Sequence, residues 1–337
     1  MQVSTIGLDI AKHVFQVHGI DRRGKAVLRK RLARAKVLGL FANLPPCLIG
    51  MEACAGAHYW ARELRALGHQ VRLMPPQYVK AYVKTNKHDA ADAEACCEAV
   101  QRPGMRFVPI KSEEQQALLM LHRVRDQLIG QRTATINALR GHLAELGVVA
   151  AQRQAGLRAL LAVLGDLEDD RIPPLAREVL QTLAAQLRDL GDRIAELDSR
   201  LVALTRDDPI CRALAEVPGV GPVIATAFAA TLPDATSFRS GRHVAAWLGL
   251  VPRQHATGGK PRQLGLSKRG DGYLRRQLIH GARALVKVSP GHSGRLWSWI
   301  NGLRQRRPVN VVVAAVANKL ARILWAMLSR GAPYRAA

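Results

Sequence analysis

The chain has 337 residues, and its 50 Lys and Arg against 26 Asp and Glu give a formal net charge of +24 at pH 7. Apolar residues make up 48% of the sequence, which excludes a disordered chain and suffices for about two or three packed domains. Such a charge on a globular composition favours a polyanionic partner. Five Cys residues without C-x-x-C spacing exclude a disulfide framework and a zinc ribbon. We expect no signal peptide and a cytoplasmic, nucleoid-associated protein.

Residues 3–101 have the pattern of an α/β unit. Short apolar or alternating segments predict β-strands at 3–9, 14–18, 26–32, 47–53 and 70–74. Helices are predicted at 35–44, 57–67 and 76–83, and a further helix begins near Asp89. Three strands followed by alternating helix and strand are typical of an RNase H-like sheet. A Rossmann fold is excluded because no Gly-rich phosphate loop follows the first strand.

The middle of the chain, residues 112–205, is predicted to be helical, beginning at a Ser112 cap that Glu113 and Glu114 follow. Apolar residues then alternate spacings of three and four from Leu180 to Leu204, which is the a/d pattern of a coiled coil. This helix can pair with a second copy of the chain or fold back on residues 113–146. We expect the first, a dimer through the coiled coil. The predicted domains are therefore 1–111, 112–210 and 211–337.

The C-terminal domain is predicted to be mostly α-helical. Its residues 214–222 read as a helix-hairpin-helix, in which Gly219 and Gly221 would let backbone N–H groups approach a phosphate. A plain Gly-rich turn between packed helices is the alternative. The last helix, 309–329, is interrupted by polar residues, which excludes a membrane span; these are Asn310, Asn318, Lys319 and Arg322.

Charge is distributed unevenly along the chain. Residues 212–337 hold 20 basic and 3 acidic side chains, a net charge of +17, whereas residues 1–211 carry +7. We therefore expect nucleic acid to bind mainly in the C-terminal domain. The carboxylates retained in the N-terminal part form ordinary surface ion pairs or bind metal.

Four carboxylates have a placement that favours metal binding. Asp9 ends the first predicted strand, Glu52 ends the fourth, and Asp89 and Asp92 share one face at the start of a helix. If these side chains converge at one sheet edge, divalent cations are needed to offset their repulsion, and their oxygens suit Mg²⁺ or Mn²⁺. Asp89 taken alone could equally be a helix N-cap.

Two Gly-containing basic segments precede a basic helix in the C-terminal domain. Their cations are predicted to bind phosphates: Lys260, Arg262, Lys268, Arg269, Arg275 and Arg276. Thr257 and Ser267 place hydroxyl groups among these cations, where a nucleophile could attack a bound phosphate. A hydroxyl in a loop is more often a turn former, and the residues alone select neither as catalytic.

Several motifs together resemble the DEDD transposases of the insertion-sequence one-hundred-and-ten family, eleven-eleven branch, which are bridge-RNA-guided recombinases. The motifs are Gly7-Leu-Asp9-Ile-Ala-Lys12, Glu52-Ala53 with Gly56, Lys87-His-Asp89-Ala-Ala-Asp92-Ala93, Pro218-Gly-Val-Gly221 and the run from Gly249 to Arg276. The resemblance implies a RuvC-like N-terminal domain, a coiled coil, a C-terminal transposase domain and a tetramer. It also implies a structured guide RNA that pairs with donor and target DNA. The DEDD acids fall on Asp9, Glu52, Asp89 and Asp92.

The resemblance also places a catalytic serine within His255-Ala-Thr-Gly258, where this sequence has Ala256 and Thr257 instead. Either Thr257 is the nucleophile, or Ala256 marks a lost serine; we expect the second, and hence a chain that cuts DNA poorly. The predicted function is RNA-guided strand exchange between donor and target DNA. The alternatives are a metal-dependent junction nuclease without a covalent intermediate and a non-catalytic nucleic-acid-binding protein.

Overall fold

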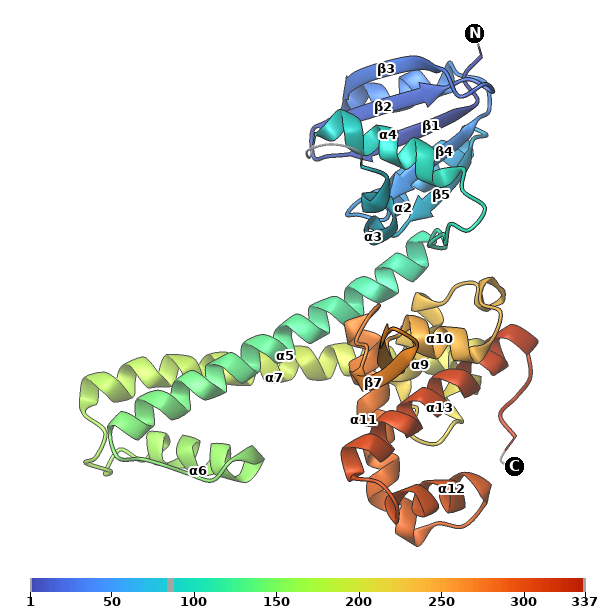
Figure 1. Ribbon diagram of the computed structural model, residues 1–337. Helices are drawn as coiled ribbons and strands as arrows, with labels where there is room; N and C mark the ends of the chain where they lie inside the picture. The colour runs from blue at the N-terminus through green and yellow to red at the C-terminus, as the bar shows by residue number, and fades with distance from the viewer. Residues whose placement is uncertain (1, 84–87, 336–337) are drawn as a thin grey trace. The chain divides into compact units, whose positions relative to one another are not determined.

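In the computed structural model, which describes residues 2–83 and 88–335, the N-terminal strands form one five-stranded sheet in the order β3-β2-β1-β4-β5 (Figure 1). The first three strands pair antiparallel, and β4 and β5 continue the sheet in parallel. This is the predicted α/β sheet. Its elements are β1 (Thr5–Ile10), β2 (Val14–Ile20), β3 (Ala26–Ala33), α1 (Val37–Ala42), β4 (Leu48–Glu52), α2 (Ala57–Ala66), β5 (Gln70–Met74), α3 (Pro76–Val79) and α4 (Asp89–Val100).

The two faces of this sheet are packed differently. On one face, alternate residues such as Ile6, Leu8 and Ile49 form a core with Phe41 of α1 and Trp60 of α2. Period-two alternation of the strand residues explains why these side chains all point the same way. The opposite face lies under α4, which packs on β1, β2 and β4.

Glycines at the centre of the second face bring α4 into contact with the strand backbone. A Cβ atom added at Gly7 would lie 1.9 Å from the carbonyl oxygen of Ala93. One added at Gly50 would lie 2.6 Å from Cβ of Val100. Any larger residue on β1 or β4 at these positions would force the helix away. The absence of a side chain at Gly7 and at Gly50 therefore determines how closely α4 packs on the sheet.

The long helices α5 (Glu113–Glu145) and α7 (Pro174–Asp207) form a hairpin, with α6 (Arg153–Gly165) between them in sequence (Figure 1). The Leu seam of α7 is buried within this one chain: Leu180 and Leu187 share a core with Leu139 and Leu143 of α5. Our expectation that the seam joins two copies was therefore wrong. The connection from α5 to α7 contains α6, whose Leu160 and Leu164 join the same core, and folding back buries the seam without a partner.

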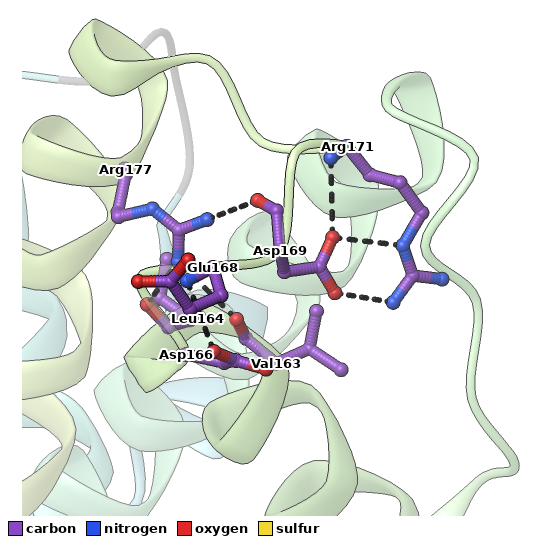
Figure 2. Close-up of polar contacts among 7 residues, drawn as sticks. All are labelled: Val163, Leu164, Asp166, Glu168, Asp169, Arg171 and Arg177. Atoms are coloured by element: carbon purple, nitrogen blue, oxygen red, sulfur yellow. Dashed lines mark hydrogen bonds and ion pairs between the residues drawn. The ribbon is translucent and has the colours of Figure 1, made fainter.

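A buried arginine holds the connection between α6 and α7. The Arg177 guanidinium donates to the carbonyl oxygens of Leu164 at 2.8 Å and of Asp169 at 2.6 Å (Figure 2). The carboxylate of Asp169 accepts from Arg171, whose hydrogen bonds lower the pKa of Asp169 to about 2. Arg177 thus satisfies the Leu164 carbonyl in the last turn of α6, which has no partner within the helix, and ties it to the Asp169 carbonyl of the following loop.

The C-terminal helices enclose a separate core. They are α8 (Pro209–Ala215), α9 (Pro222–Thr231), α10 (Gly241–Trp247), α11 (Gly272–Val288), α12 (Arg295–Arg304) and α13 (Val309–Arg330). Among the described residues, α13 is the one helix that is long and apolar enough to cross a membrane by length and composition. Its Val312, Val316, Leu320 and Leu324 are buried against α10 and α11, which is the packing of a core helix.

The chain divides into two compact units, Met1–Gln116 and Ala117–Ala337. The helical hairpin, which we expected as a region of its own, belongs with the C-terminal helices. The buried imidazole of His122 in α5 explains this grouping. Its Nδ1 lies 2.9 Å from the Tyr273 hydroxyl of α11, and its Nε2 lies 3.0 Å from the Thr226 hydroxyl of α9.

Residues 252–266, which we expected to be a basic loop, form a two-stranded antiparallel hairpin of β6 (Pro252–Thr257) and β7 (Lys260–Leu266). Gly258 and Gly259 form its two-residue turn, and both have positive φ angles, of 57° and 76°. Two residues with positive φ match the right-handed twist of paired strands, and glycine adopts this conformation without strain.

Replacing Gly7 with Ala should separate α4 from the sheet. We expect Gly7→Ala to lower the free energy of unfolding by at least about 2 kcal/mol, because the new methyl group overlaps the Ala93 carbonyl. Gly39→Ala in α1 is the control, since its added Cβ meets no described atom within 4 Å. Urea denaturation of the two variants measures the difference. Equal stability of the two would show that α4 does not rest on Gly7.

The stability of the second unit should fall at acidic pH because of His122. Burial, and then the charge of Arg125, lowers the pKa of His122 to about 4. Above pH 6.5 the imidazole is neutral whether folded or unfolded and contributes nothing. Between pH 6.5 and 4 only the unfolded state takes up the proton, so stability falls by up to about 3 kcal/mol. In urea denaturation, His122→Gln should remove this part of the pH dependence; an unchanged pH profile would contradict it.

Candidate functional site

Asp9 and Glu52 lie side by side at one edge of the sheet. In the parallel pair of β1 and β4, Leu8 lies opposite Met51, and Asp9 and Glu52 are the next residues. Alternation along each strand puts them on the face of Gly7 and Gly50, which α4 covers. Two predicted site residues are therefore brought together by strand register.

Asp92 joins them from α4. The thiol of Cys96, one turn further along the helix, is buried, and this burial raises its pKa well above the usual value. The negative charges of Glu52, Asp9 and Asp92 raise the pKa further. The Cys96 thiol therefore lies within electrostatic range of each of these three carboxylates.

Asp89 is exposed, one turn before Asp92, at the first position of α4. The helix cap is His88, whose Nδ1 accepts from the backbone N–H of Ala90 at 3.1 Å. Asp89 is therefore not the N-cap, and its side chain is exposed at the start of α4. Lys87 of the same motif lies outside the described residues.

The donor chemistry of this cluster fits a divalent cation. Within residues 2–83 and 88–335, no group of three His, Cys, Asp or Glu side chains is already spaced to hold an ion. Mg²⁺ does not require such a cage, since it commonly keeps several waters and uses one or two carboxylates together with substrate phosphates. Asp9, Glu52 and Asp92 supply carboxylate oxygens of the kind that hard cations prefer.

The β6–β7 hairpin sorts its side chains onto two faces. His255 pairs with Arg262 and Thr257 pairs with Lys260, so these four residues share one face. Ala256 and Gln254 lie on the other face. One hydroxyl, one imidazole and two cations thus stand together on an exposed hairpin. We had not expected His255 in this group; alternating side chains around the Gly-Gly pair were the signal that could have shown it.

The remaining predicted cations are arranged differently. Lys268 and Arg269 are exposed, and Lys268 has a positive φ of 54°. Arg275 donates to the carbonyl oxygens of Leu248 at 2.9 Å and of Arg269 at 2.8 Å, so it holds this loop in place. Arg276 forms an ion pair with Asp126 at 2.6 Å.

Two further predicted groups are the Ser267 hydroxyl and the turn of residues 218–221. The Ser267 hydroxyl is buried and has no hydrogen-bond partner among the described residues. The Pro-Gly-Val-Gly turn does join two helices, α8 and α9, as expected. A Cβ at Gly219 would lie 2.7 Å from Leu285, so this glycine permits close packing on α11, the alternative we had left open. Gly221, at the start of α9, faces open space.

Two family models match the chain, one in its N-terminal part and one in its C-terminal part. Residues 6–147 match the DEDD transposase model of the IS110 group, and residues 211–296 match the model described as the transposase IS116/IS110/IS902 family. The chain belongs to the IS110 family of transposases. A DEDD domain implies dependence on a divalent metal in general, and a transposase acts on DNA.

Full-length relatives place the chain in the IS1111 branch. It is 54% identical to a probable family 20 transposase of Pseudomonas aeruginosa, over 99% of both chains. The transposase for insertion sequence element IS1328 of Yersinia enterocolitica is 41% identical over 98% of both chains. The transposase for insertion sequence element IS1111A of Coxiella burnetii is 39% identical, over 99% of this chain and 92% of its own.

If the hairpin binds phosphates, its cations should set part of the salt dependence of DNA binding. For Lys260→Gln and for Arg262→Gln, we expect the slope of log affinity against log salt to become shallower by about 0.9 each. Lys25→Gln, in the exposed turn before β3, is the control and should leave the slope unchanged. Fluorescence anisotropy of a labelled duplex measures the slopes. Parallel slopes for all variants would exclude hairpin–phosphate contacts.

Proposed function

We propose that this transposase exchanges DNA strands through a covalent intermediate on Thr257. The observation that carries the proposal is the hairpin register, which places the Thr257 hydroxyl on one face with His255, Lys260 and Arg262. Ala256, where we had expected a lost serine, lies on the opposite face, away from these groups. The register therefore favours Thr257 over position 256, and the chain keeps a nucleophile.

The chemistry conserves phosphodiester bonds. The Thr257 oxygen attacks the scissile phosphorus, one P–O ester bond breaks, and the released DNA end leaves as a hydroxyl after gaining a proton. The threonine loses its own proton to solvent or to a neighbouring base. Lys260 and Arg262 stabilise the negative charge that develops on the phosphoryl oxygens. Attack on this intermediate by the hydroxyl end of a second DNA then forms the recombinant strand and regenerates Thr257.

The carboxylates of the first unit have a separate part in this proposal. Asp9, Glu52, Asp89 and Asp92 would hold Mg²⁺ or Mn²⁺, and such an ion would offset negative charge on phosphate oxygens. The register that puts Asp9 beside Glu52, and the charges of Asp9, Glu52 and Asp92 that act on the Cys96 thiol, support this assignment. Isolated carboxylates would only repel a polyanion, so their retention in a chain of net charge +24 is consistent with metal binding.

A guide RNA and several copies of the chain complete the proposal. The net charge of +17 after residue 211 can neutralise phosphates of an RNA as well as those of a DNA duplex. Exchange between two duplexes breaks four DNA strands, whereas each chain carries one Thr257. We therefore propose a tetramer, assembled through surfaces other than the buried seam of α7.

Variants of the hairpin should separate the two candidate positions. Thr257→Ala should reduce formation of a denaturant-stable protein–DNA adduct by on the order of 10³-fold or more, because no hydroxyl remains on the cationic face. Thr257→Ser should retain the adduct, since the unbranched side chain reaches the same face with more freedom. Ala256→Ser in the Thr257→Ala background should not restore it. A denaturing gel with labelled DNA, RNA and Mg²⁺ reports all three.

The outcomes also separate the alternatives. An adduct restored by Ala256→Ser would place the nucleophile at position 256 instead. Cleavage without any adduct would indicate a junction nuclease that uses water, and binding without cleavage would indicate an architectural protein. Sequencing of nucleic acid that copurifies with the full chain should recover one discrete RNA species; random fragments alone would contradict the guide RNA.

A further inference from the structure

A groove of about 710 Å³ runs beside α4 on the part of the sheet that the helix leaves open. Its polar lining comes from two strands and the start of α4: Gln16, His18, Arg29, Lys30, Arg31, His88 and Glu94. Arg29 and Arg31 belong to the edge strand β3, and both are exposed. The groove therefore has a basic wall formed by the last strand of the sheet.

Strand register connects this wall to the carboxylate cluster. Arg31 pairs with Gln16, and Gln16 pairs with Asp9, so the three residues form one row across β3, β2 and β1. Arg29, His18 and Gly7 form the next row in the same way. Paired residues point to the same face, and two strand spacings separate Arg31 from Asp9 by roughly 10 Å between backbones. The arginines and the acids thus share one face of the sheet.

Protection of an edge strand does not account for the position of Arg29 and Arg31 on β3. Cations on an edge discourage pairing with other sheets whichever face they occupy. Here two guanidinium groups stand on the face that also carries acids, yet within the described parts of the chain no ion pair engages either of them. Guanidinium forks match phosphate oxygens in geometry and charge. Such a pair is a site for an anionic chain that continues from the acids.

We propose that Arg29 and Arg31 bind the phosphodiester backbone of a DNA strand that runs to the proposed metal site of Asp9, Glu52 and Asp92. This inference rests on the proposed function of the carboxylate cluster and adds a direction to it: the DNA strand crosses the sheet from β1 towards β3. The occupant is DNA because the row ends at the acids, which act on the strand that is cut. Arg29 and Arg31 are positioning residues and touch no reacting atom.

Arginine labelling tests the contact without any requirement for cleavage. The full chain is treated with an arginine-specific dicarbonyl reagent, with and without a short single-stranded DNA, and modified residues are read by mass spectrometry. Modification of Arg29 and Arg31 should fall about 10-fold with DNA, as expected for a charge-assisted hydrogen bond. Arg23, exposed in the turn of the same β-hairpin, is the control and should react equally in both samples. Equal reactivity of Arg29 and Arg31 with and without DNA would overturn the proposal.

A charge-pairing cycle then locates the contact on the DNA. Neutral methylphosphonates are placed one at a time beside the scissile phosphate, and cleavage rates are compared for the unmodified chain, Arg31→Gln and Arg23→Gln. At one DNA position, the methylphosphonate should slow cleavage by the unmodified chain and by Arg23→Gln about 10-fold. At the same position it should not slow cleavage by Arg31→Gln any further. Cleavage with no such coupling would overturn the proposed contact between Arg31 and the DNA backbone, and it would leave the proposed function unaffected. Absence of cleavage in every protein, together with protected arginines, would instead count against the proposed function.

Discussion

The contact between α4 and two glycines of the sheet is the constraint on which the candidate site depends. A helix that packs on strands through side chains stands about 10 Å above them. Gly7 and Gly50 remove the intervening side chains, so that α4 touches strand backbone. Only at this closeness can an aspartate in the first turn of α4 reach carboxylates at the ends of β1 and β4. Gly7 and Gly50 thus determine both how α4 packs on the sheet and how near Asp92 lies to Asp9 and Glu52.

The same contact places the buried thiol of Cys96 near the carboxylates, whose negative charges raise its pKa. In the proposed function, a divalent cation held by these carboxylates would attract the phosphates of the DNA. The arginines of β3 lie across the same face and extend that attraction along the DNA.

Much of this could be predicted from the sequence, for identifiable physical reasons. Alternating apolar residues determined the strands of the first unit, and strand ends determined where Asp9 and Glu52 lie. The partner of the α7 seam could not be predicted, because Leu180 and Leu187 would show the same spacing against a second copy or against α5. The β6–β7 hairpin was missed because its residues are exposed and polar, which leaves a Gly-Gly pair as the main local signal. Its two faces, and therefore the choice between positions 256 and 257, depend on register that only the fold provides.

Mn²⁺ binding to the full chain tests the central claim most directly, because it reports the carboxylate cluster without any other step. Electron paramagnetic resonance of free Mn²⁺, in the presence of a short DNA strand, gives the affinity for the unmodified chain and for Asp92→Asn. The account predicts that Asp92→Asn weakens binding by roughly tenfold or more, with the fold intact, since one of the two carboxylates in the first turn of α4 is then neutral. Equal Mn²⁺ affinity of the two proteins would contradict this account, because Asp92 of α4 would then take no part in metal binding.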